Sequence, residues 1–153
     1  MKSNMKVLPS EELIPSLLEL LEETDQVPLV ISGGSMSPFL AHHRDTVYLS
    51  KIHRPLKRGD MILYRRVSGK YILHRIYRTE SNTYTLVGDA QTELEQGISP
   101  DQVLAIVTAV RRKGKLLKPG SFWWEFFRLV WIRLIPLRPK ILTLYSWTVR
   151  LFR

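Results

Sequence analysis

Several common features are missing from this chain of 153 residues, and each absence excludes a class of protein or site. There is no cysteine, so disulfides and thiolate metal sites are excluded. No apolar run near the N-terminus is long enough for a secretory signal peptide. The four histidines lack the spacing of metal ligands. The length fits one domain with one core of ordinary size.

The positive charge of the chain is concentrated near its C-terminus. The formal net charge is +9, but residues 1–110 carry 12 Lys or Arg and 13 Asp or Glu. Residues 111–153 carry 11 basic residues and a single acid, Glu125, together with nine of the 15 aromatic residues. A nucleic-acid-binding domain usually spreads its basic residues over a folded face. We therefore expect no nucleic-acid partner, although a nucleic-acid binder that uses the basic tail is an alternative.

The periodicity of apolar residues predicts a helix followed by a β-rich domain. In residues 1–26, apolar residues recur at the spacing of one helix face: Leu13, Ile14, Leu17, Leu18 and Leu21. From Val27 the pattern changes to short β-rich runs between turn residues. Strands are predicted at 28–32, 46–50, 60–67, 71–78, 83–87 and 103–112. Residues 27–118 are therefore expected to form a small, mostly antiparallel β-domain.

The tail, residues 119–153, is predicted to be helical and to lie on a membrane surface. Its longest charge-free stretches, 129–132 and 141–149, are far shorter than the roughly 20 residues that cross a bilayer. Pro136 and Pro139 divide it into two short aromatic pieces that also contain arginine, a composition typical of the headgroup region. We expect peripheral attachment to anionic lipid, with the cytoplasmic face favoured. The alternative is a helical pair packed on the β-domain.

A serine between turn-forming residues is the first candidate for chemistry. Residues 32–38 read Ser-Gly-Gly-Ser-Met-Ser-Pro, in which glycines let the backbone turn tightly and approach a bound peptide. A serine on such a turn presents its hydroxyl outward, and neighbouring N–H groups can point at a developing oxyanion. Gly-Gly-Ser also forms ordinary loops, so Ser35 needs further support as a nucleophile.

A histidine and a carboxylate supply that support. His74 lies in the middle of the apolar run 71–77, where its ring nitrogens need partners if it is buried. Asp89 follows the next predicted strand. A histidine can take the serine proton while a carboxylate holds the imidazole in the required tautomer. The alternative for His74 is a buried histidine with a purely structural role.

In their order and spacing these motifs resemble the signal peptidase family. The resemblance covers about residues 28–112 and includes histidine followed by arginine, as in the endoplasmic-reticulum and archaeal branch. It implies a serine endopeptidase that cleaves a signal or leader peptide from a precursor, with Ser35 as nucleophile and His74 as general base. No metal or organic cofactor is implied. The matching motifs are Ser35-Met36-Ser37-Pro38, Gly59-Asp60, His74-Arg75 and Gly88-Asp89.

The resemblance also suggests which residues assist. Asp89 is expected to orient His74, with Glu95 as a second candidate acid. The substrate is expected to be an extended peptide along a β-edge. Gly33 stands where family members often have a serine that helps to form the oxyanion hole. The residues expected to contact substrate are Gly33, Gly34, Met36, Pro38 and Phe39.

Two other functions fit parts of the pattern. A LexA-like self-cleaving domain shares the expected fold but uses lysine as the base. Lys70 is the lysine nearest to His74, and four strand residues separate them by about 13 Å. Lys70 would therefore replace His74 rather than assist it. The other possibility is a non-catalytic adaptor at a membrane surface that keeps the β-fold.

Overall fold

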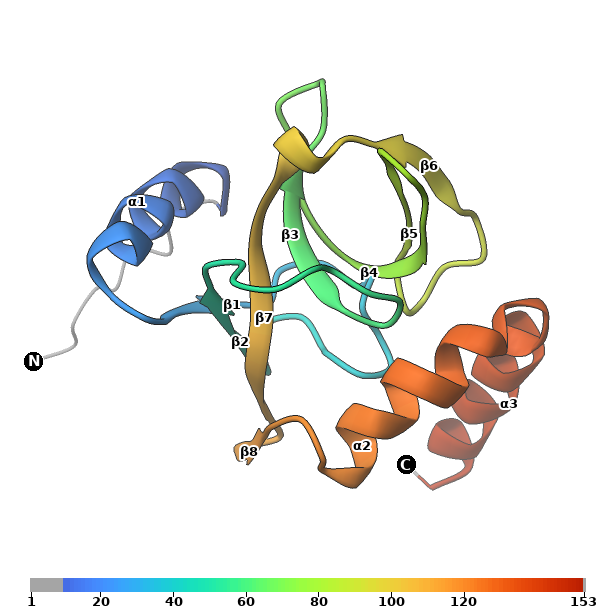
Figure 1. The fold of residues 1–153 in the computed structure, drawn as a ribbon. Helices are drawn as coiled ribbons and strands as arrows, with labels where there is room; N and C mark the ends of the chain where they lie inside the picture. The colour runs from blue at the N-terminus through green and yellow to red at the C-terminus, as the bar shows by residue number, and fades with distance from the viewer. Residues whose placement is uncertain (1–9, 153) are drawn as a thin grey trace, which may run out of the picture.

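A computed structural model describes residues 10–152 and shows a mostly β protein (Figure 1). One antiparallel sheet of eight strands has the order β1-β2-β7-β3-β4-β5-β6, with β8 paired to β7. This confirms the predicted antiparallel β-domain with an N-terminal helix and a C-terminal helical tail. The strands are β1 (Val27–Val30), β2 (Thr46–Ser50), β3 (Met61–Arg65), β4 (Tyr71–Thr79), β5 (Tyr84–Val87), β6 (Glu95–Ile98), β7 (Val103–Arg112) and β8 (Lys115–Leu117). The helical elements are α1 (Ser10–Glu23), η1 (Pro100–Gln102), α2 (Phe122–Glu125), η2 (Phe126–Val130), η3 (Trp131–Arg133), η4 (Ile135–Leu137) and α3 (Arg138–Leu151).

Two strands have no counterpart among the predicted ones. β6 begins with Glu95, Gln96 and Gly97, which have little preference for strands, and it forms by pairing with β5. β8 has three residues and pairs with the end of β7. The predicted strands 46–50 and 103–112 coincide with β2 and β7, and the remaining four overlap β1, β3, β4 and β5.

The helix predicted in residues 1–26 is confirmed for Ser10–Glu23, and residues 1–9 lie outside the described part of the chain. Ile14 and Leu21 are buried against the sheet, as one apolar face requires. The helix continues through Pro15.

β3 is buried on both faces because the sheet curls around it (Figure 1). Successive side chains of a strand point to opposite faces. Met61 and Leu63 belong to a cluster that includes residues of α1, β1 and the tail. Ile62 and Tyr64 belong to a second cluster with residues of β5 and β6. Tyr64 is fully buried, so its hydroxyl needs a hydrogen-bond partner inside the protein.

The first half of the tail packs on the β-domain. Trp124, Phe127, Trp131 and Ile132 are all buried, and the Phe127 ring stacks on Phe39 with centroids 4.6 Å apart. These four side chains therefore belong to the protein core, the arrangement expected for a tail packed on the β-domain. Their apolar area is already removed from water by the protein.

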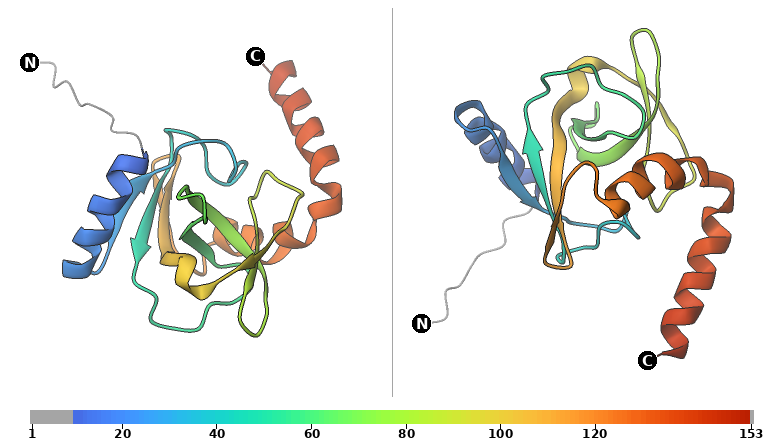
Figure 2. Two further views of the ribbon diagram at one scale, coloured as in Figure 1. Left: turned by 90° about the horizontal axis from the view of Figure 1, so that it is seen from above. Right: turned by 60° about the horizontal axis from the view of Figure 1, so that its bottom comes forward.

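The second half of the tail, helix α3, extends away from the sheet (Figure 2). Most of its apolar side chains are exposed, including Leu144, Tyr145, Trp147 and Leu151. Within residues 10–152, no helix has both the length and the apolar character that crossing a membrane requires. The two halves of the tail therefore have different environments.

Candidate active site

Ser35 and His74 line the same cleft, which has a volume of about 400 Å³. One wall is the segment 31–36, which follows β1, and the other is formed by residues 70–74 at the start of β4. Arg66 and Gln91 complete the lining. The fold thus brings together the two residues that the sequence identifies as nucleophile and base.

Gly88 lies next to both Ser35 and His74. A Cβ atom at this position would lie 2.6 Å from the Ser35 carbonyl oxygen and 3.0 Å from His74 Nε2. The Ser35 backbone and His74 Nε2 therefore both lie beside the Gly88 Cα. Within residues 10–152 no hydrogen bond joins Ser35 Oγ to His74, and a contact of this kind often tightens only when substrate binds.

The Ser35 segment is held by its own backbone and by His42. Gly33 has a φ of +85°, in the left-handed region that favours glycine. Its N–H donates to His42 Nδ1 over 2.7 Å, and the Ser37 N–H donates to the Gly34 carbonyl over 3.1 Å. These bonds fix the turn that carries the half-buried Ser35.

His74 is kept neutral by burial. Its side chain is almost fully enclosed, and burial lowers its pKa from the ordinary 6.5 to about 4. The negative charges of Glu95 and Asp89 oppose this shift, but they do not cancel it. A neutral imidazole at pH 5–8 is the protonation state that a general base requires.

A tyrosine fixes which nitrogen of His74 carries the proton. The Tyr64 hydroxyl donates to Glu95 Oε2 over 2.8 Å and lies 3.3 Å from His74 Nδ1. A hydroxyl has one proton, and a carboxylate can only accept, so the Tyr64 proton points at Glu95. The hydrogen bond between Tyr64 and His74 then needs a proton on Nδ1, which we assign as the donor to the Tyr64 oxygen. Nε2, the nitrogen beside Gly88, is then free to accept a proton. Burial raises the pKa of Tyr64, which keeps its hydroxyl protonated.

Glu95 is ionised and held by arginine. Arg66 donates to both of its carboxylate oxygens, with Nη2 2.7 Å from Oε2 and Nε 3.0 Å from Oε1. Burial would raise the Glu95 pKa, but the hydrogen bonds from Arg66 and Tyr64 outweigh it and hold the pKa below its ordinary value. The path from base to acid therefore runs from His74 through Tyr64 to Glu95.

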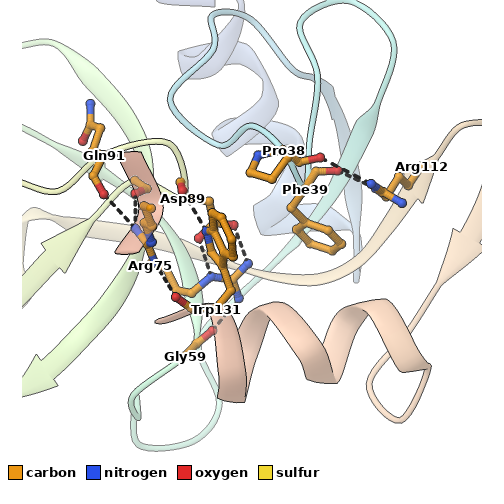
Figure 3. Close-up of polar contacts among 10 residues, drawn as sticks. Pro38, Phe39, Gly59, Arg75, Asp89, Gln91, Arg112 and Trp131 are labelled. Atoms are coloured by element: carbon orange, nitrogen blue, oxygen red, sulfur yellow. Dashed lines mark hydrogen bonds and ion pairs between the residues drawn. The ribbon is translucent and has the colours of Figure 1, made fainter. Parts of the chain in front are cut away.

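The geometry expected for Asp89 requires a correction. Asp89 is fully buried and accepts from Arg75 at both oxygens, with distances of 3.0 and 2.9 Å, and no hydrogen bond within residues 10–152 joins it to His74 (Figure 3). Arg75, the residue after the base, faces the opposite side of β4 from His74 and takes this carboxylate. Glu95, the second candidate acid, is the one linked to His74.

The residues expected to contact substrate divide into two groups. Gly33, Gly34 and Met36 line the cleft. Phe39 does not, because its fully buried ring stacks on Phe127 in the core. Pro38 lies on another groove, and its carbonyl accepts from Arg112 over 3.3 Å (Figure 3).

Several residues of the site have no local signal in the sequence. Tyr64 and Arg66 are ordinary residues of a predicted strand and its end, and they act only because β3 lies beside β4. Trp131 and Arg138 lie in the tail yet reach the turn 88–91 beside His74. Only the three-dimensional pairing of distant segments identifies these four residues.

Among the described residues 10–152, no group of His, Asp and Glu side chains is arranged to hold a metal ion. The amino-acid sequence was also compared with models of known protein families and with curated proteins. It matches no family model and no curated protein.

Proposed function

We propose that this protein is a serine endopeptidase, with Ser35 as nucleophile and His74 as general base. The observation that carries the proposal is that both residues line one cleft, with the Ser35 carbonyl oxygen and His74 Nε2 both next to Gly88. The buried, neutral imidazole and its link through Tyr64 to Glu95 support the same assignment. The resemblance of the motifs to signal peptidases supplies the expected reaction class.

In the proposed reaction, Ser35 Oγ attacks the peptide carbonyl while its proton passes to His74 Nε2. The imidazolium now has a proton on each nitrogen. Its Nδ1 proton still points at the Tyr64 oxygen, and the negative charge of Glu95 behind Tyr64 stabilises the imidazolium. His74 returns the proton to the leaving amine, and water then hydrolyses the acyl-enzyme through the same base. Burial lowers the His74 pKa and so disfavours the imidazolium. The Glu95 charge offsets part of this effect and should therefore raise the rate.

The oxyanion would be bound mainly by backbone. Within residues 10–152 the Ser35 N–H donates to no protein group, whereas the Gly33 N–H is already bonded to His42. Gly33 has no side chain to contribute. The Ser35 amide is therefore the donor that we assign to the developing oxyanion, in the manner of backbone oxyanion holes.

The proposed substrate is an extended peptide of a precursor protein, bound as an added strand. β4 pairs with β3 along residues 71–75, but it pairs with β5 only from Arg75 onward. Residues 71–74 therefore have one free edge among the described strands, and that edge forms a wall of the cleft. An extended peptide could hydrogen-bond to it and run past Ser35.

The test is cleavage and covalent labelling of the full chain. A fluorophosphonate probe should label Ser35, and Ser35→Ala and His74→Ala should each lower peptide cleavage by about 10³-fold or more. Ser37→Ala, two residues along the same turn, is the matched control and should stay active. An active, folded Ser35→Ala protein would refute the proposal.

Two outcomes point to the alternatives. Lys70 also lines the cleft, so loss of activity in Lys70→Ala with retention in His74→Ala would favour lysine as the base, as in LexA-like domains. Absence of labelling in the folded wild type would favour a non-catalytic adaptor.

Helix α3 is the proposed site of attachment to an anionic membrane. Leu144, Trp147 and Leu151 are exposed, and residues 126–153 contain no Asp or Glu. Exposed apolar side chains beside Lys140 and Arg150 suit an anionic lipid surface. Intact protein should bind phosphatidylglycerol vesicles more tightly than phosphatidylcholine vesicles. Trp147→Ser should weaken this binding, whereas Val67→Ser, at an exposed site on the β-domain, should not.

A further inference from the structure

The turn 88–91 touches both members of the proposed catalytic pair. The turn is closed by a bond of 3.0 Å from the Gln91 N–H to the Gly88 carbonyl. The Ala90 N–H donates to the Ser35 carbonyl over 2.9 Å, and Gly88 lies against His74 Nε2. A shift of this turn would therefore move Ser35 relative to His74.

The other side of the turn is held by the C-terminal tail (Figure 3). The Trp131 indole N–H donates to the Asp89 carbonyl over 2.8 Å. Arg138 Nη1 donates to the carbonyls of Gly88 and Gln91, over 2.9 and 2.8 Å. Three of the four carbonyls of the turn thus accept hydrogen bonds from two tail side chains.

The buried position of Arg138 carries a desolvation cost, and no apolar side chain could replace its hydrogen bonds. Arg138 is fully buried, and its Nη2 donates to the Trp131 carbonyl over 3.1 Å, which ties the two tail residues together. Burial lowers the Arg138 pKa, and the Asp89 charge opposes that change. An apolar side chain would fill the same space without this desolvation cost, but it would remove a donor from three carbonyls, and within residues 10–152 only those of Gly88 and Trp131 would keep a backbone N–H donor.

We propose that Trp131 and Arg138 are positioning residues of the active site, which act through the turn 88–91 on the geometry of Ser35 and His74. The tail would then help to position the catalytic residues, in addition to its proposed role in membrane binding. The inference rests on the proposed peptidase function for its kinetic readout, whereas its structural readout does not depend on catalysis.

The kinetic test compares Arg138→Ala with Arg133→Ala, an exposed arginine on the same segment. We expect Arg138→Ala to lower kcat by about 10²-fold, because a displacement of about 1 Å at a reacting group has an effect of that size. KM should change little, since neither residue lines the cleft. Added guanidinium should restore part of kcat in Arg138→Ala and have no such effect in Arg133→Ala. An unchanged kcat in folded Arg138→Ala would overturn the proposal.

The structural test uses hydrogen exchange of the Ala90 amide, which is bonded to the Ser35 carbonyl. Exchange should accelerate in Arg138→Ala and slow again with guanidinium, while amides in the centre of β7 keep their protection. If Arg138→Ala does not fold, Trp131→Phe, which removes the indole N–H donor but keeps an aromatic ring, should also accelerate Ala90 exchange. Wild-type exchange rates at Ala90 in the folded variant would overturn the proposal. Faster exchange in a protein whose wild type cleaves nothing would uphold positioning and reject the peptidase function.

Discussion

Asp89 and Glu95, the two carboxylates whose charges act on His74, have opposite environments. Asp89 and its partner Arg75 are fully buried, with side-chain exposures of 0% and 2%. Glu95 and its partner Arg66 are partly exposed, at 27% and 36%. Asp89 is embedded among the elements that hold the site, whereas Glu95 stands behind Tyr64 and pairs with Arg66, which lines the cleft.

The two environments separate a structural role for Asp89 from the catalytic role proposed for Glu95. The buried pair stabilises the turn 88–91 and the start of β3, because Arg75 also donates to the Gly59 carbonyl over 2.8 Å. The Glu95–Arg66 pair is linked to His74, because Tyr64 joins Glu95 to His74. In the proposed mechanism, the acid of the recognisable motif therefore has a structural role, while a less conspicuous acid acts on His74.

Replacing Asp89 with Asn should give the largest effect. It leaves Arg75 buried without its carboxylate and removes the charge that favours the buried Arg138 cation. Breaking a buried ion pair by removing one partner typically costs about 3–5 kcal/mol. Urea denaturation should show a loss of that order. Glu80→Gln, in the exposed pair with Arg78, is the matched control and should cost about 1 kcal/mol or less.

The comparison would fail if Asp89→Asn were as stable as Glu80→Gln. That result would mean that Arg75 and Arg138 find sufficient carbonyl partners without the carboxylate. The buried pair would then have no greater structural role than an exposed one.

Replacing Tyr64 with Phe should affect the rate more than any other change on the Glu95 side. The substitution removes the hydroxyl that bonds to both His74 Nδ1 and Glu95 while keeping the ring in the core. A hydrogen bond to a charged group contributes about 1.5–3 kcal/mol, which corresponds to roughly a ten- to hundredfold loss of kcat. Tyr84→Phe in β5 is the control. Equal kcat values for the two variants would remove Tyr64 from the mechanism.

Gly88 should tolerate a methyl group less well than Gly34. At Gly88 a Cβ would lie 2.6 Å from the Ser35 carbonyl oxygen, whereas at Gly34 it would meet no atom within 4 Å. Overpacking a tightly packed site costs about 1–3 kcal/mol, so Gly88→Ala should lose stability of that order and Gly34→Ala should not. Thermal unfolding of the two variants checks this. Equal melting temperatures would show that the walls of the cleft move apart easily.

Much of the sheet and the pairing of Ser35 with His74 could be predicted from the sequence. β2 has an alternating pattern and β7 is a long, largely apolar run, and their predicted bounds agree with the structure. Ser35 follows a predicted strand and His74 lies within another, and their pairing was expected from the resemblance of the motifs to signal peptidases. Local pattern was sufficient only for the strands.

The support around this pair could not be predicted, because it depends on which strands become neighbours. β6 carries Glu95 and has almost no strand signal of its own. The tail has one composition throughout, yet Trp131 is buried and Trp147 is exposed. What distinguishes them is contact with the turn 88–91, a segment about 40 residues earlier in the chain. Composition contains no information on such contacts.

The smallest expected effect is on the titration of His74, and it tests the two carboxylates directly. Because burial lowers the His74 pKa from 6.5 to about 4, the folded protein resists protonation that the unfolded chain accepts. This contribution to stability is complete above pH 6.5 and declines as the pH falls towards 4.

Both carboxylate charges raise the His74 pKa, with Glu95 the larger contributor. Glu95→Gln should therefore lower the His74 pKa further and shift the acidic limb of kcat/KM in the same direction. NMR titration of the His74 ring measures the pKa in both the wild type and the variant. A rise in the pKa on losing Glu95 would contradict the charge path through Tyr64. A larger drop in folded Asp89→Asn than in Glu95→Gln would make Asp89 the carboxylate that acts more strongly on the base.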